Sequence, residues 1–133
     1  MLLTKKSEYA LLSLISIARS EELKNVDVLS RELNIPKSFL AKIMQNLAKN
    51  SIVKSQRGVN GGFVLFKPYD QLTILEITTA AEEKIPSVFE CSPSMQSCPS
   101  DVGSCCTIWP LLNNLQNKIN IFLEDLTLKD LAT

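Results

Sequence analysis

A chain of 133 residues is long enough for one domain with a small appendage, and a hydrophobic content of 45% is ordinary for a soluble globular protein. The apolar stretch within the opening MLLTKKSEYALLSLISIA is too short to span a bilayer and lacks a small-residue cleavage site, so we expect a cytoplasmic protein with no membrane association. The formal net charge of zero hides a polarised molecule, because residues 1–67 carry eleven Lys and Arg against five Asp and Glu, and residues 68–133 carry three against nine.

The basic half begins with two predicted helices. Apolar residues recur at three- and four-residue spacing from Leu3 to Arg19, which indicates a first amphipathic helix. After a polar connector at residues 21–26, Asp27 is expected to cap a short helix from Val28 to Leu33. Asn34 can end this helix in a left-handed turn.

A longer helix is expected to run from Pro36, which suits a first helical position, to about Asn50. One side of this helix is apolar, and the other carries mostly polar and basic residues: Lys37, Ser38, Ala41, Lys42 and Gln45. A short helix, a tight turn and a longer helix form a helix-turn-helix, whose second helix would enter the major groove of DNA. Many small helical bundles share this pattern, so the next segment is needed to sharpen it.

A β-hairpin is predicted next. Residues 52–55 and 63–66 are β-prone, and the turn sequence QRGVNGG lies between them. Such a hairpin would be the wing of a winged helix, with tip residues that reach a minor groove or phosphates. The candidate DNA contacts at this tip are Gln56, Arg57, Gly58, Asn60 and Gly61.

The charge pattern supports the same partner. No acidic residue occurs between Leu33 and Tyr69, while six basic residues do. A basic segment without acids is the electrostatic footprint expected for double-stranded DNA, although a solvated basic face would give the same pattern.

All four cysteines lie in one polar, turn-rich stretch, Cys91-SPSMQS-Cys98-PSDVGS-Cys105-Cys106, which follows a short helix predicted from a capping box at Thr73. Zinc sites usually contain close C-x₂₋₄-C pairs, which this stretch lacks, and the chain has no histidine. Three well-spaced thiols with a fourth ligand other than histidine suit an iron–sulfur cluster better than zinc. The alternative is four thiols in a surface loop that share no role.

A long C-terminal helix is predicted from a continuous apolar stripe: Ile108, Leu111, Leu112, Leu115, Ile119 and Phe122. Such a helix needs a partner, either its own domain or the same helix of a second chain. We expect a homodimer, because a two-fold dimer would match a palindromic operator. A second capping box, from Thr127 to Asp130, predicts a terminal helical turn.

Over its full length the chain resembles the IscR/NsrR-type winged-helix regulators, the Rrf-two family. The resemblance rests on LTKKSEYALLSL, IPKSFLAKIMQNLAKNSIVKSQRGVNGGFVL, LTILEI, the cysteine loop and INIFLEDLTLKDL, and the RGxxGG wing followed by an aromatic residue is quite specific. It implies a homodimeric transcription regulator, usually a repressor. It also implies that the DNA affinity of this regulator is set by a two-iron (2Fe-2S) or four-iron (4Fe-4S) cluster held by three cysteines and a fourth, non-cysteine ligand.

The resemblance also implies a ligand set. Counted back from the TLKDL ending, Cys106 matches the family's third cysteine, so the expected metal ligands are Cys91, Cys98 and Cys106, with Cys105 as the alternative to Cys106. Glu8 matches the acidic residue that some relatives offer from the first helix of the partner subunit, so Glu8 of the partner subunit is the candidate fourth ligand. The alternative for Glu8 is a charge favoured by the helix dipole.

Two other functions remain open at this point. Some members of the family lack a cluster, and here a Cys98–Cys106 or Cys91–Cys105 disulfide would give a cluster-free thiol switch. A scaffold whose basic face binds an acidic protein is a third interpretation. No nucleophile–base pair or phosphate-binding glycine loop is visible, so we do not expect an enzyme.

The predicted fold is therefore mainly α with a small β-hairpin wing. We expect a winged helix-turn-helix at residues 1–83, a cysteine-rich cluster-binding loop at 84–107, and a dimerisation helix with a C-terminal turn at 108–133. The expected function is a DNA-binding repressor that senses nitric oxide, redox state, or iron and cluster status.

Overall fold

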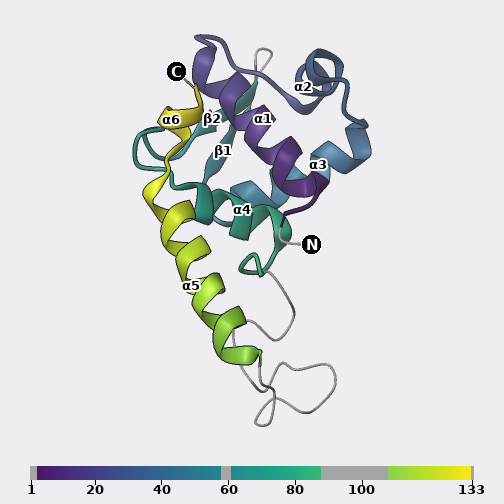
Figure 1. Cartoon of the computed structure of the whole chain (residues 1–133). Coiled ribbons are helices and arrows are strands. Elements are labelled where there is room, and N and C mark those ends of the chain that lie inside the picture. Colours follow the sequence, from purple (N-terminus) through teal and green to yellow (C-terminus); the bar gives the residue numbers. More distant parts are fainter. Residues whose placement is uncertain (1–2, 58–60, 88–107, 133) are drawn as a thin grey trace.

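The computed structural model describes residues 3–57, 61–87 and 108–132, and shows a winged helix followed by a long C-terminal helix (Figure 1). The elements are α1 (Lys5–Arg19), α2 (Val26–Leu33), α3 (Lys37–Lys49), β1 (Val53–Gln56), β2 (Gly62–Leu65), α4 (Ile74–Glu82), α5 (Trp109–Asp125) and α6 (Leu128–Ala132). The predicted fold class, mainly α with a two-stranded hairpin, is confirmed.

Local capping explains where the first two helices begin. The Thr4 side chain accepts a hydrogen bond from the backbone N–H of Lys6, so α1 starts two residues later than predicted. The predicted cap of α2, Asp27, is wrong, because Asn25 accepts the hydrogen bond from the Val28 N–H at 2.9 Å. Asp27 lies inside the first turn instead, where a negative charge is favoured by the helix dipole.

The turn between α2 and α3 is tight. Asn34 adopts the predicted left-handed conformation, with φ of 56°, and ends α2. Pro36 is not the first helical residue as predicted, because its ψ of 129° is extended and α3 begins at Lys37. The Pro36 carbonyl instead accepts a hydrogen bond from the Leu40 N–H, so the proline precedes the first turn of α3.

The wing is one residue out of step with the prediction. β1 and β2 pair antiparallel, with Val53 opposite Leu65 and Gln56 opposite Gly62. The strands therefore span residues 53–56 and 62–65 rather than 52–55 and 63–66. Ile52 precedes β1 and is fully buried, and its carbonyl accepts a hydrogen bond of 2.9 Å from the Phe66 N–H just after β2.

One hydrophobic core joins the winged helix to the C-terminal helices. It contains Leu14 of α1, Leu29 of α2 and Ile77 of α4, together with Leu123 of α5 and Leu128 of α6. The connection from α5 to α6 is joined to the segment before α4 by backbone hydrogen bonds, from the Leu128 N–H to the Leu72 carbonyl at 2.8 Å and from the Ile74 N–H to the Leu126 carbonyl at 2.9 Å. From this junction α5 extends away from the rest of the described molecule (Figure 1).

Candidate nucleic-acid interface and sensor residues

The outer side of α3 carries the predicted DNA contacts. Leu40, Ile43, Met44 and Leu47 bury one side of the helix in the core. On the opposite side Ser38, Lys42 and Gln45 are exposed at four- and three-residue spacing, which places them along one line on the helix surface.

Lys37, at the start of α3, is held by an ion pair. Its ammonium group contacts the Asp27 carboxylate of α2, and the hydrogen bond and positive charge of Lys37 lower the pKa of Asp27. Both side chains are more than half exposed, so water and salt weaken the pair. A DNA phosphate can therefore compete with Asp27 for Lys37.

At the hairpin tip, Gln56 and Arg57 are exposed and Gly61 is half-buried. The other two predicted contacts, Gly58 and Asn60, lie outside the described residues. β1 packs against α3, and the Ile52 N–H just before β1 donates a hydrogen bond of 3.0 Å to the Leu47 carbonyl of α3. We call Ser38, Lys42 and Gln45 together with Gln56 and Arg57 the reader surface.

Lys24 fixes the wing to the helix-turn-helix, a role that the sequence analysis missed. Its carbonyl accepts a hydrogen bond of 3.0 Å from the Phe63 N–H. A Cβ on Gly62 would lie 2.7 Å from the Lys24 backbone, so only glycine allows this approach. The Lys24 ammonium group donates to Ser16 of α1 and to Glu32 of α2, each at 2.8 Å. One residue thus holds α1, α2 and the wing together.

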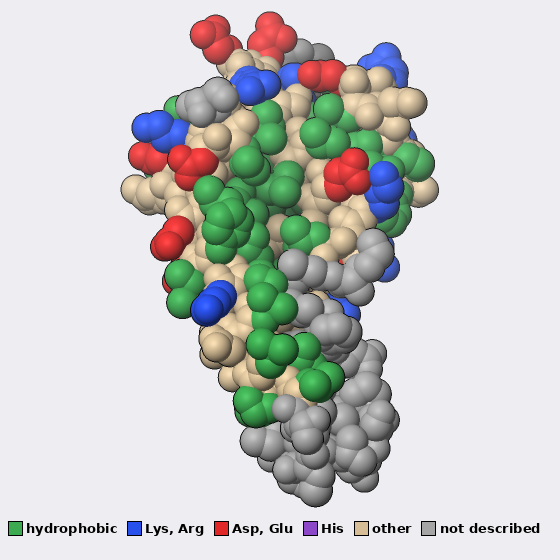
Figure 2. Space-filling view, in the orientation of Figure 1, with side chains coloured by type: hydrophobic (Ala, Val, Ile, Leu, Met, Phe, Trp, Pro, Cys, Tyr) green, Lys and Arg blue, Asp and Glu red, His purple; other side chains and the backbone are tan. Residues whose placement is uncertain are grey.

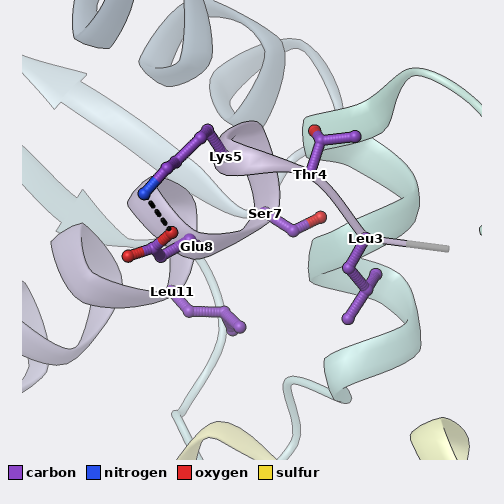
Figure 3. A pocket seen from close by; sticks show the side chains of 6 residues that line it. All are labelled: Leu3, Thr4, Lys5, Ser7, Glu8 and Leu11. Atoms are coloured by element: carbon purple, nitrogen blue, oxygen red, sulfur yellow. Dashed lines mark ion pairs between the residues drawn. The ribbon is translucent and has the colours of Figure 1, made fainter. Parts of the chain in front are cut away.

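Glu8 lies on the exposed side of α1, beside an open pocket of about 290 Å³ that is also lined by Leu3, Thr4, Lys5, Ser7 and Leu11 (Figure 3). Its carboxylate is 3.1 Å from the Lys5 ammonium group, and roughly half of the Glu8 side chain remains exposed (53%). The hydrogen bond from Lys5 to Glu8 raises the pKa of Lys5. Glu8 is therefore accessible from outside the chain.

A buried carboxylate, Glu82, ties the end of α4 to the start of α1. It accepts hydrogen bonds from the Thr4 N–H at 2.8 Å, the Thr4 hydroxyl at 2.8 Å and the Ser7 hydroxyl at 2.6 Å. Burial raises the pKa of Glu82, but the hydrogen bonds from Ser7 and Thr4 together outweigh it, so the pKa lies below its ordinary value. The carboxylate is held in its charged form without a basic partner among its hydrogen-bonding residues.

The cysteine ligands predicted from the sequence, Cys91, Cys98 and Cys106 with Cys105 as alternative, lie outside the described residues. Within residues 3–57, 61–87 and 108–132, no group of three or more Cys, Asp and Glu side chains is placed to hold a metal ion. No helix in this part of the chain is both long and apolar enough to cross a membrane.

The apolar stripe of α5 divides between two environments. Leu112 is buried, and Ile119 is partly buried against the chain's own core, which also contains the neighbouring Leu123. The remaining members are largely exposed, with exposed fractions of 56% for Ile108, 68% for Leu111, 42% for Leu115 and 63% for Phe122. Figure 2 shows hydrophobic side chains at the surface along α5. We call Ile108, Leu111, Leu115 and Phe122 the open face of α5.

The family model of Rrf2, described as an iron-dependent transcriptional regulator, matches residues 3–133. The chain belongs to this family. An HTH-type transcriptional regulator of Aquifex aeolicus is 30% identical over 98% of this chain and 91% of the relative. The HTH-type transcriptional regulator IscR of Cronobacter sakazakii is 29% identical over 99% of this chain and 80% of the relative.

Solved structures show the same fold. CymR, described as the global cysteine regulator of B. subtilis, superposes with a TM-score of 0.74 at 24% identity, covering 98% of this chain and 95% of CymR. The Rrf2 match makes the chain a transcription regulator, and its winged helix is the DNA-binding architecture of that class. Both sequence relatives named above are HTH-type transcriptional regulators.

Proposed function

We propose that this Rrf2 regulator is a homodimeric repressor that binds a palindromic operator, and that an iron–sulfur cluster of the 2Fe-2S or 4Fe-4S type controls its DNA affinity. The part of this proposal that concerns DNA binding rests on the reader surface. Its basic and polar side chains project from α3 and the wing, within a stretch of sequence that contains no acidic residue.

The reader surface divides the work of binding. Lys42 and Arg57 supply charges for phosphates, which position the protein on the duplex without reading sequence. Ser38 and Gln45 carry side chains that can hydrogen-bond base edges in the major groove. Ala41, half-buried between them, can only contact a thymine methyl group.

The salt dependence of DNA affinity tests the proposed DNA interface. A duplex ligand is first selected from a random-sequence library, and its affinity is measured over a range of salt concentrations. Replacing both basic residues, by Lys42→Ala with Arg57→Ala, is expected to weaken binding and to reduce the slope of log affinity against log salt by about 2, because roughly 0.9 counterion is released per phosphate contact.

Lys84→Ala is the matched control, because Lys84 is an exposed basic residue outside the reader surface. This variant is expected to keep the wild-type slope. If the double variant binds DNA as tightly as the wild type does, with the same slope, the reader surface is not the DNA interface.

The part of the proposal that concerns the iron–sulfur cluster rests on the chemistry of the available ligands. Cys91, Cys98 and Cys106 offer three thiolates at long spacing, and no histidine competes as a ligand. Glu8 of the partner subunit is the proposed fourth ligand, and the exposure of Glu8 beside its pocket supports this. When bound, the cluster supplies a group that reacts with oxidants or nitric oxide.

Purification without air tests the cluster. Iron and sulfide content and the visible absorption spectrum are measured for Cys106→Ser and for Cys105→Ser, two variants that differ only in which of two adjacent thiols is lost. Cys106→Ser is expected to lose the cluster and Cys105→Ser to keep it. Glu8→Ala is expected to keep a cluster of altered stability, since another ligand can replace one carboxylate.

A cluster-free thiol switch is the second candidate, favoured by the two adjacent cysteines at positions 105 and 106. In that case the protein purified without air is colourless, all thiols are free, and DNA binding does not respond to iron. Mild oxidation would then change DNA binding and form a Cys98–Cys106 or Cys91–Cys105 disulfide, which peptide mass analysis identifies.

A further inference from the structure

The segment of residues 83–87, which leads from α4 toward the cysteines, is held by buried hydrogen bonds near both of its ends. At the start, Glu82 is fixed to Thr4 and Ser7 of α1. Near the end, the Pro86 carbonyl accepts a hydrogen bond of 2.7 Å from the side-chain amide of Gln116 in α5. The chain then continues into residues 88–107, which contain every cysteine of the protein.

Gln116 is an unusual residue for its position. Only 3% of it is exposed, and it lies on the side of α5 that also buries Leu112 and Leu123. Its amide nitrogen donates both to the Pro86 carbonyl and to the side-chain oxygen of Asn120 at 2.9 Å. A buried amide costs free energy unless it is hydrogen-bonded, so an apolar side chain would serve packing alone equally well. One thing that Gln116 adds is a donor that fixes the Pro86 carbonyl.

Both contacts lead to elements that the function uses. Glu82 fastens the segment to α1, which carries Glu8 in its first turn. The ring of Tyr9 in α1 packs edge to face on Phe39 of the recognition helix, with centroids 5.6 Å apart and planes at 87°. Gln116 fastens the segment to α5, whose open face is the proposed dimer interface.

We infer that Glu82 and Gln116 are positioning residues that transmit a chemical change at the cysteines to α1 and α5. The inference rests on the proposed function, because it requires that the state of the cysteines alters DNA affinity. Coupling between distant sites needs packed or hydrogen-bonded contacts that hold one element against another. The hydrogen bond from Gln116 to the Pro86 carbonyl joins the segment to α5, and the hydrogen bonds to Glu82, the residue just before the segment, join α4 to α1.

The test compares DNA affinity in two chemical states of the full-length protein. Affinity is measured with the cysteines loaded with iron and inorganic sulfide and again after chelation, and likewise with thiols reduced and oxidised. Each pair of states gives one ratio of DNA affinities, loaded to chelated or reduced to oxidised. The larger of these two ratios is compared among the wild type, Gln116→Met and Glu82→Gln. Methionine matches the length of glutamine and lacks its donor, and Asn117→Ala, an exposed position one residue along α5, is the control.

The wild type and Asn117→Ala are expected to show a ratio of about ten or more. In Gln116→Met and Glu82→Gln the ratio is expected to fall toward one, while at least one state keeps wild-type affinity. A purely structural role would weaken both states alike and leave the ratio unchanged. An unchanged ratio in the variants, beside a large ratio in the wild type, overturns this inference but not the proposed function. A wild-type ratio of one overturns both the proposed sensor and this inference. If Gln116→Met does not fold, Glu82→Gln decides by the same criterion.

Discussion

A buried carboxylate needs hydrogen-bond donors in place of water, and Glu82 has them at the start of α1. The Thr4 N–H and the hydroxyls of Thr4 and Ser7 replace its hydration, and the positive end of the α1 dipole favours its charge. Because these contacts act on the ionised form, they lower the pKa of Glu82 despite its burial. Protonation of Glu82 therefore weakens the attachment of α4 to α1.

The lowered pKa predicts an acid-sensitive contribution to stability. A group whose pKa is lower in the folded than in the unfolded chain stabilises the fold above its unfolded pKa, and this contribution is lost as pH falls through the folded pKa. Glu82→Gln is expected to lower the free energy of unfolding by about 2 kcal/mol near pH 7, because charge-assisted hydrogen bonds are lost. The difference from the wild type is expected to shrink below about pH 4.5, the range where ordinary Glu side chains titrate.

Chemical denaturation at a series of pH values measures this difference. Glu83→Gln is the control, because it removes a neighbouring carboxylate that is exposed. A Glu82→Gln difference that is equally large at pH 7 and pH 3 would contradict the argument, since it would show that the ionised form carries no special stabilisation.

Residues whose role depends on their sequence neighbours could be predicted from the sequence. Residues whose role depends on contacts with segments far away in the sequence could not. Asn34 was predicted to end α2, because a left-handed residue after a helix is a local requirement. Gly62 was assigned only to the wing, because its contact with the Lys24 backbone joins segments far apart in sequence. Glu82 and Gln116 were missed for the same reason.

Among the elements, periodicity predicted the helix-turn-helix, the hairpin and α5, but not how α5 divides its apolar stripe. The spacing of Leu112, Leu115 and Ile119 is compatible with one buried face. The structure buries Leu112, packs Ile119 partly buried against the chain's own core and leaves Leu115 exposed, a difference that the periodicity of α5 alone does not predict. For the candidate site, the cysteine spacing supports a cluster, and the ligand assignment itself stays a prediction.

For the whole molecule, the open face of α5, together with the partly buried Ile119, has a spacing that suits an antiparallel two-fold dimer. Ile108 precedes Leu115 by seven residues and Phe122 follows it by seven, while Leu111 precedes it by four and Ile119 follows it by four. If two copies of α5 pack antiparallel about an axis at Leu115, each of these residues meets an apolar residue of the other chain. The exposed apolar side chains of α5 would then be covered on both chains.

The last prediction tests this dimer through charge. Leu115→Glu and Leu115→Lys, each alone, are expected to raise the dimer dissociation constant by about 100-fold or more, because like charges would meet in a buried seam. An equimolar mixture of the two variants is expected to form a heterodimer in sedimentation experiments.

A double variant that combines Ile108→Glu with Phe122→Lys tests the direction of packing. Antiparallel packing places opposite charges together and keeps the dimer, whereas parallel packing places like charges together and dissociates it. If Leu115→Glu alone sediments as an unchanged dimer, the interface lies on another surface and the axis at Leu115 is wrong.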